Sequence, residues 1–283
     1  MITIQQPQPA QWDALNDSFQ SVALSTGVTL PYVEQGDAGG VPVVLLHGGT
    51  DSWRSFEPVL PYLPSSIRAF ALTQRGHGDA SRPAAGYHPR DFAADVAAFL
   101  DSQGLSRAVI AGHSMGSTVA LRFALDFPQR TRGLVPMGAF VRYRTNPVIT
   151  DFWETVVVPL RDPIDRRIAQ EFQESTLAGP ISARFLEIAI AESLKVPARV
   201  WRNLFAGLRD DEHAARLGSV AAPTLLIWGD QDAFVPESDQ VTLLATIAGS
   251  RLETYRGTGH AVHWEEPARF AADLATFAER LAE

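Results

Sequence analysis

Short apolar runs alternate with longer helical patterns along most of the chain. Strand candidates occupy residues 43–46, 67–72, 108–111, 133–135, 223–228 and 252–255. Helical stretches separate most of them, at residues 91–100, 115–127, 238–247 and 267–281. Runs that are apolar at successive positions are typical of strands buried on both faces. The alternation predicts an α/β fold with a doubly wound, mostly parallel sheet.

Two further strands precede these runs. Residues 19–34 have the pattern of two short strands that turn at Gly27, and Gly36, Gly39 and Gly40 then break the pattern. This segment is typical of an antiparallel hairpin at the edge of a sheet. Together with the six later runs it predicts eight strands.

Residues 140–217 interrupt the alternation. This stretch has several helical patterns but no strand run, and five proline-containing breaks punctuate it. We therefore predict a helical insertion at 140–217 and a core domain formed by residues 1–139 and 218–283. Its aromatic residues are expected mainly to pack the insertion against the sheet.

Composition narrows the class of protein and its partners. The net charge of −8 and the scattered arginines give no general attraction to nucleic acid. No apolar run approaches the roughly 20 residues that span a bilayer. We expect neither nucleic acid nor membrane as a partner, and the oligomeric state stays open.

The compartment is indicated by the N-terminal segment and by the cysteine count. Met1 to Gln20 lack a basic leader and a continuous apolar stretch, so we predict no signal peptide. The chain has no cysteine, which excludes disulfides, thiolate metal sites and a cysteine nucleophile. These features suit a reducing cytoplasm.

Ser114 is the candidate nucleophile. It is the centre of GHSMG at residues 112–116, which follows one predicted strand and begins a predicted helix. A Gly-x-Ser-x-Gly pattern arises by chance about once in ten chains of this length, so the strand-to-helix context is the stronger argument. Such a turn strains the serine backbone and lifts its hydroxyl above the sheet.

Two backbone N–H groups are candidates for an oxyanion hole. The helix after Ser114 begins with free donors and a positive dipole end, and Met115 supplies the first donor. The second is expected from the loop after an earlier strand, where HGGT occupies residues 47–50 and Gly49 is the preferred donor. His47 is expected to be structural.

His260 is the candidate general base, because serine needs a base and the base needs an orienting acid. It lies on the glycine-rich loop 257–260 after the last predicted strand, at the sheet edge where ligands bind in such folds. His113 is expected to pack or to make a local hydrogen bond. The remaining histidines are expected to be solvated or structural: His77, His88, His213 and His263.

Asp230 and Asp232 are the two candidates for the acid. Both follow the strand run at 223–228. Residues 137–141 carry no carboxylate, so the alternative acid position after the preceding strand is empty. The residues alone place the acid in the 230–232 loop.

The combined motifs resemble the α/β-hydrolase superfamily over nearly the whole chain. They are HGG at 47–49, RGHG at 75–78, GHSMG at 112–116, the loop 229–236, and GH at 259–260 with EP at 266–267. The family's Gly-x-x-Asp-x-x-x-Pro loop matches Gly229, Asp232 and Pro236, so the resemblance favours Asp232 over Asp230. It also implies that the insertion is a cap over the active site. One departure is Thr73, where the family often has Asp.

The resemblance implies acyl transfer by Ser114, with no metal and no organic cofactor. We predict a carboxylic ester or lactone hydrolase acting on a small, largely apolar molecule. A serine at position 114 disfavours haloalkane dehalogenases and epoxide hydrolases, which use aspartate. The alternatives are a carbon–carbon bond hydrolase of aromatic ring-cleavage products, a cofactor-free haloperoxidase or perhydrolase, and a non-catalytic ligand receptor.

Candidate pocket residues lie just beyond strand ends or beside catalytic residues. Phe140, Phe234 and Val262 meet this criterion. An apolar lining of this kind favours an apolar acyl or alcohol group. Arg142 and Arg144 are candidate contacts for an anionic substrate, although we expect them to form a solvated hinge of the insertion.

Overall fold

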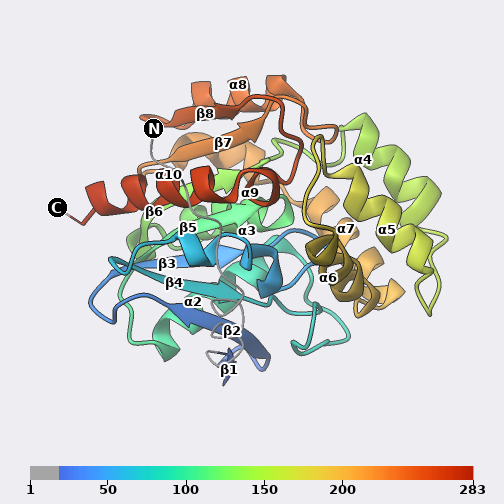
Figure 1. Ribbon diagram of the computed structural model, residues 1–283, viewed down its shortest axis with the longest axis horizontal. Helices are drawn as coiled ribbons and strands as arrows, with labels where there is room; N and C mark the ends of the chain where they lie inside the picture. The colour runs from blue at the N-terminus through green and yellow to red at the C-terminus, as the bar shows by residue number, and fades with distance from the viewer. Residues whose placement is uncertain (1–18, 283) are drawn as a thin grey trace.

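The computed structural model of the protein describes residues 19–282. The predicted absence of a leader concerns Met1 to Gln20, nearly all of which lie outside the described residues. Eight strands form one sheet in the order β1-β2-β4-β3-β5-β6-β7-β8 (Figure 1). Their bounds are β1 Phe19–Ala23, β2 Thr29–Gln35, β3 Val41–Leu46, β4 Ile67–Leu72, β5 Ala108–His113, β6 Thr131–Met137, β7 Leu225–Gly229 and β8 Arg251–Tyr255.

Pairing within the sheet confirms the predicted fold class. Parallel pairing joins β4 to β3, β3 to β5, β5 to β6, β6 to β7 and β7 to β8. β1 and β2 form the antiparallel hairpin that was expected at the edge, and β2 joins the sheet through antiparallel pairing with β4. The carboxyl ends of the parallel strands therefore meet at one edge.

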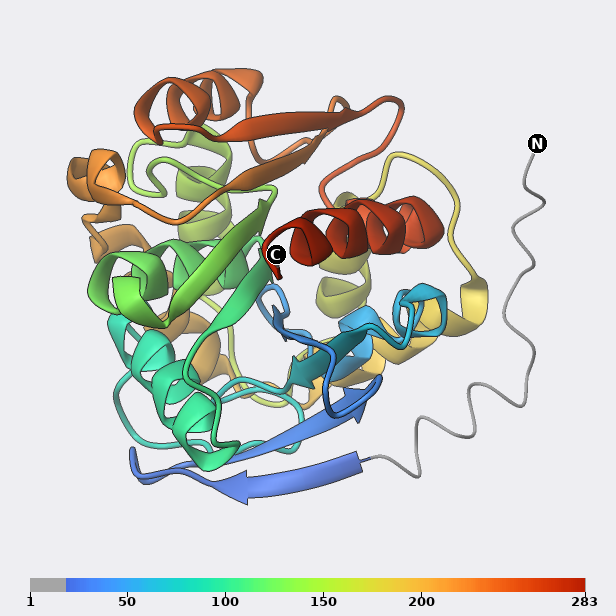
Figure 2. The same ribbon diagram turned by 90° about the vertical axis from the view of Figure 1, so that its left-hand side faces the viewer.

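Helices cover both faces of the sheet. Helices α2 (Pro89–Ser102) and α3 (Met115–Asp126) lie on one face, and α10 (Pro267–Arg280) lies on the other (Figure 2). Side chains along β3 alternate between two hydrophobic clusters: Val44 and Leu46 join the cluster of α2 and α3, whereas Val43 and Leu45 join that of α10. This period of two explains why the strand is apolar at successive positions.

Several element ends differ from the sequence prediction. β5 and β6 run two residues further than predicted, because Gly112 pairs with Pro136 and His113 with Met137. Sheet pairing here overrides the weak strand preference of glycine and proline. Helix α2 begins before Asp91, since the His88 side chain caps it. The other two core helices are α8 (Glu237–Thr246) and α9 (Val262–Glu265).

Helical segments fill the chain between β6 and β7, and all but the last lie within the predicted insertion at 140–217; the last one ends two residues beyond it. They are α4 Pro147–Phe152, a π-helical turn Trp153–Val157, α5 Arg166–Ser175, α6 Ala183–Leu194, α7 Ala198–Asp210 and a 3-10 segment His213–Ser219. Figure 1 shows α4 to α7 gathered on one side of the sheet. None of the helices in residues 19–282 is long and apolar enough to cross a membrane.

Candidate active site

Ser114 occupies a strained turn between β5 and α3. Its backbone has φ 53° and ψ −115°, and its N–H donates to the carbonyl of Met137 (2.9 Å). A Cβ on residue 112 would lie 2.0 Å from the carbonyl oxygen of Gly116, and one on residue 116 would lie 2.2 Å from that of Leu46. Only glycine fits at these two positions, so the flanking glycines allow the strained turn.

The two candidate oxyanion donors, Gly49 and Met115, line the same cavity as Ser114. Met115 is the first residue of α3, and Gly49 lies in the loop that follows β3. His47 fixes that loop, because its Nδ1 donates to the Gly48 carbonyl (2.7 Å) and its Nε2 accepts the N–H of Gln74 (2.9 Å). Burial holds the pKa of His47 well below its usual value, so the ring is neutral.

His260 and Asp232 form a buried pair. His260 Nδ1 lies 2.7 Å from Asp232 Oδ2, and the aspartate side chain is fully buried. Asp232 Oδ1 accepts the N–H groups of Phe234 (2.8 Å) and Val235 (2.9 Å). Asp230 is turned toward solvent and accepts the N–H of Gly257 (2.7 Å). Of the two candidate acids, the structure therefore brings only Asp232 to the histidine.

Ser114 and His260 line one cavity from opposite elements. Because Nδ1 of His260 faces Asp232, its Nε2 is the nitrogen left for the serine. Among the described residues there is no direct hydrogen bond between Ser114 and His260. Catalytic hydrogen bonds often tighten only when a substrate is bound.

Gly138 makes room for the histidine, and the sequence analysis did not single it out. It follows β6 with φ +54°, and a Cβ there would lie 2.8 Å from the imidazole ring of His260. In the sequence it is visible only as a glycine just after a predicted strand. It lies among residues 137–141, the alternative position for the acid that carries no carboxylate. Any side chain there would push against His260.

Buried histidines lie beside His260. The ring of His113 is 4.8 Å from that of His260 and 4.6 Å from that of His263. His113 Nε2 donates to the backbone carbonyl of His260 (3.1 Å), a long-range bond where a local one was expected. Burial lowers the pKa of His113 well below its usual value and that of His263 to about 3. Both rings are neutral supports of the His260 loop.

The other histidines are structural. His77 and His213 are buried, like His263, so the alternative that they are solvated is wrong for all three. His88 is the N-cap of α2.

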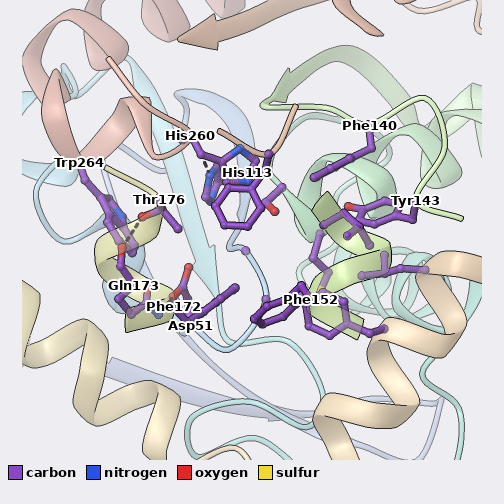
Figure 3. Close-up of a pocket in the computed structure, with 18 residues that line it drawn as sticks. Asp51, His113, Phe140, Tyr143, Phe152, Phe172, Gln173, Thr176, His260 and Trp264 are labelled. Carbon is purple, nitrogen blue, oxygen red and sulfur yellow. Dashed lines mark hydrogen bonds between the residues drawn. The ribbon is translucent and has the colours of Figure 1, made fainter. Parts of the chain in front are cut away.

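A small cavity lies at the carboxyl edge of the sheet. Figure 3 shows His260 with Phe140 and Tyr143 on one side and Asp51 and Gln173 on the other. The catalytic candidates Gly49, Ser114, Met115 and His260 all border it. The other lining residues are Gly48, His113, Ile149, Phe152, Phe172, Thr176, Phe205, Leu208, Phe234 and Trp264.

The three predicted pocket residues have different locations. Phe140 and Phe234 line the cavity. Val262 does not, which corrects the prediction. It begins α9 and is buried in the cluster of α10, because the chain turns away from the cavity immediately after His260.

Asp51 and Gln173 are polar lining residues that sequence reasoning missed. Gln173 Nε2 donates to Asp51 Oδ1 (2.8 Å), and burial raises the pKa of Asp51 to about 7. Asp51 follows the HGGT motif directly, which is the one signal that marked it. Gln173 lies in the insertion, where no motif identifies it.

Positive charge is absent from the described lining of the cavity. Arg142 is exposed, and Arg144 pairs with the exposed Asp210, as expected for a solvated hinge. Within residues 19–282, no group of three or more His, Asp or Glu side chains is arranged to hold a metal ion.

Comparison with known proteins identifies the family. The sequence profile described as "alpha/beta hydrolase fold" matches residues 41–267, which is most of the chain. The chain belongs to the α/β-hydrolase superfamily.

Relatives of this α/β-hydrolase carry different activity names. A 2-hydroxymuconate semialdehyde hydrolase from Pseudomonas sp. strain CF600 is 30% identical over 85% of this chain and 88% of its own. A 2-hydroxy-6-oxononadienedioate/2-hydroxy-6-oxononatrienedioate hydrolase from Klebsiella pneumoniae is 27% identical over 86% and 88%. The solved esterase RhEst1 from Rhodococcus sp. ECU1013 is 27% identical, with a TM-score of 0.83 over 93% of this chain and 99% of that one.

The one departure from the superfamily pattern has a local role in this α/β-hydrolase. Thr73, which replaces the frequent Asp, is buried, and its Oγ1 accepts the N–H of Trp53 (3.2 Å). Arg75 two residues later is paired with buried Asp95 (2.6 Å). The loop keeps its hydrogen bonds without the aspartate.

Proposed function

We propose that this α/β-hydrolase cleaves a neutral, largely apolar carboxylic ester or lactone through an acyl-enzyme on Ser114. The observation that carries the proposal is the lining of the cavity. Aromatic and aliphatic side chains dominate it, and among its described lining residues there is no arginine or lysine. Such a site desolvates an apolar group well but gives a carboxylate no cationic partner.

The reaction follows from the arrangement of the side chains. His260 Nε2 removes the Ser114 proton as Oγ attacks the carbonyl carbon, and Asp232 stabilises the imidazolium that forms. The N–H groups of Gly49 and Met115 stabilise the negative oxygen. His260 then protonates the departing alkoxide, and a water activated by the same histidine hydrolyses the acyl-enzyme.

Carbon–carbon bond hydrolysis is the second candidate, because the relative at 30% identity is named for a ring-cleavage product. The names of these relatives include a dienedioate, which carries two carboxylates. In this chain an anionic group would enter a cavity whose described lining includes the carboxyl of Asp51 but no arginine or lysine. That electrostatic mismatch favours the neutral ester.

Matched substrates test the proposal. p-Nitrophenyl butyrate and p-nitrophenyl hydrogen glutarate have similar acyl lengths, but only the second carries a carboxylate. We expect kcat/KM to be at least tenfold higher for the neutral ester, from roughly 1.4 kcal/mol or more of unpaired-charge penalty. Equal or reversed preference would contradict the neutral-substrate proposal.

Controls separate the alternative functions. Ser114→Ala should abolish turnover of both esters while the protein stays folded. Faster hydrolysis of a 2-hydroxy-6-oxo-dienoate than of any ester would support the carbon–carbon hydrolase. Acid-dependent peroxide activity would support a haloperoxidase or perhydrolase. Failure of a fluorophosphonate to label Ser114 in folded protein would support a non-catalytic receptor.

A further inference from the structure

Thr50 has an unfavourable backbone conformation directly beside the candidate oxyanion donor Gly49. Its φ is +70°, and the residue is fully buried. Within residues 19–282, Ser114 and Thr50 are the two non-glycine residues with positive φ. A β-branched residue strongly disfavours this region, and it persists only where the surrounding structure imposes it.

Helices α5 and α6 of the insertion supply the groups that hold this residue. Thr50 Oγ1 lies 2.9 Å from the hydroxyl of Ser193, which comes from α6. Gln173, from α5, donates through Nε2 to Ser193 Oγ (2.7 Å) and to Asp51 Oδ1 (2.8 Å). Each of the four side chains is at least 95% buried.

We propose that Gln173 and Ser193 are positioning residues that hold the loop of Gly49 in the conformation that forms the oxyanion hole. The proposal rests on the proposed function, since it assigns Gly49 the role of a donor. In this arrangement the insertion sets the geometry of catalysis as well as the shape of the pocket. Gln173 and Ser193 act through Thr50 and Asp51 without touching the reacting carbonyl.

Burial makes this network effective. Hydrogen bonds among buried groups restrict each partner to one geometry, and a partner left unpaired is costly. Gln173 is also adjacent to Phe172, whose ring lines the cavity. A substrate that packs against Phe172 therefore stabilises the helix that holds the loop.

Two substitutions test the proposal by separating kcat from KM. Gln173→Leu and Ser193→Ala should each lower kcat for p-nitrophenyl butyrate about tenfold. This loss is smaller than the roughly 10²–10³-fold loss that follows removal of an oxyanion donor, because the donor is displaced and not removed. KM should change less than threefold. Affinity for an alkyl boronic acid, whose tetrahedral adduct occupies the oxyanion hole, should fall by the same factor as kcat. Gln170→Leu is the matched control, because Gln170 lies on α5 and pairs with Glu174 away from the cavity.

A rescue experiment distinguishes positioning from simple attachment of the insertion. Glycine adopts positive φ without strain, so Thr50→Gly in the Ser193→Ala background should recover at least part of the lost kcat. A double variant no better than Ser193→Ala, or single variants that raise KM with normal kcat, would overturn the proposal.

Failure of the proposed function is recognised separately, in the wild type. If the wild type turns over no ester, the rate of Ser114 labelling by a fluorophosphonate replaces kcat, because its phosphoryl oxygen occupies the same hole. Labelling that is equally fast in wild type and Gln173→Leu overturns the positioning role. If the wild type shows neither turnover nor labelling, both proposals fail.

Discussion

The floor and the roof of the cavity are built in different ways. The floor consists of the loops at the carboxyl ends of the strands, where backbone hydrogen bonds and close-packed glycines hold Ser114, His260 and Asp232. The roof consists of insertion helices, where rings pack against one another. Phe152 lies 5.2 Å from Phe172 and 5.3 Å from Phe205, measured between ring centroids.

This difference separates chemistry from specificity. Ser114, His260 and Asp232 are each fixed by atoms within a few residues or by another strand end, so their geometry tolerates almost no change. Ring contacts in the roof are non-directional and permit other side chains of similar volume. Floor substitutions should therefore reduce turnover of every substrate, whereas substitutions of the aromatic rings of the roof should change which substrates are preferred.

The largest expected effect comes from the floor. Asp232→Asn should lower kcat by about 10³–10⁴-fold, because the amide favours the wrong histidine tautomer and does not stabilise the imidazolium. Asp230→Asn is the matched control two residues away and should lower kcat less than threefold, as Asp230 faces solvent. Steady-state kinetics on a neutral aryl ester measure both. Similar losses of kcat in the two variants would contradict the choice of Asp232 over Asp230 as the acid.

A substitution at Gly138 should produce the next largest effect. The added Cβ of Gly138→Ala would meet the His260 ring, so we expect a 10–100-fold loss of kcat from misplacement of the base. Gly249→Ala carries a similar positive φ, but a Cβ there meets nothing within 4 Å. The control should therefore lose stability but keep its kcat. Activity normalised to folded protein decides between the two outcomes.

A roof substitution should change preference by about tenfold. Phe172→Ala enlarges the cavity, so kcat/KM should rise for bulky esters relative to small ones. We expect a change of about tenfold, which is typical of one or two methylene groups in an apolar pocket. Trp153 lies in the helical turn that follows Phe152 but does not line the cavity. Trp153→Ala should therefore leave the ratio of kcat/KM for bulky and small esters unchanged. An equal loss on all esters would show that the aromatic rings of the roof also control the chemistry.

Acid should weaken the floor more than the roof. His77 and His263 have pKa values lowered by burial to about 4 and about 3, so the unfolded chain gains protons below pH 6.5 before the folded protein does. The raised pKa of Asp51, about 7, acts in the opposite direction, because the folded protein then holds the extra proton. His47 and His113 are neutral in the folded protein as well, so four buried histidines oppose the single effect of Asp51. The free energy of unfolding should therefore fall as pH falls from 6.5 to 4.5.

Urea unfolding of variants measures this contribution. Below pH 6.5, the free energy of unfolding of His263→Gln should increase relative to that of the wild type by about 1 kcal/mol for each pH unit. Trp153→Ala should show a difference that does not depend on pH. A pH-independent difference for His263→Gln would contradict a neutral buried His263.

The same contrast explains what could be predicted from the sequence. The mostly parallel sheet and its edge hairpin follow from local periodicity, and the family is confirmed. Ser114, His260 and Asp232 could be proposed from the sequence because each follows a strand within a short glycine-rich or proline-ended motif. Val262 was misplaced because proximity in sequence to His260 does not fix the direction of the next turn.

Contacts between distant segments were not predictable. Gln173 meets Asp51 across 122 residues, and His113 meets the His260 carbonyl across 147. Neither contact leaves a local pattern, because each depends on where whole helices or strands pack. Gly138 lies between these cases, since its position after a strand was visible but its contact with the His260 ring was not.

Trapping the acyl-enzyme would show whether Ser114 is the nucleophile. The wild type is mixed with p-nitrophenyl butyrate, quenched with acid within the first turnover, digested and examined by mass spectrometry. We predict one butyryl group on the peptide that contains Ser114, formed together with a burst of p-nitrophenol. Steady turnover with no acyl group on Ser114, or with the group on another residue, would contradict the assignment of Ser114 as nucleophile.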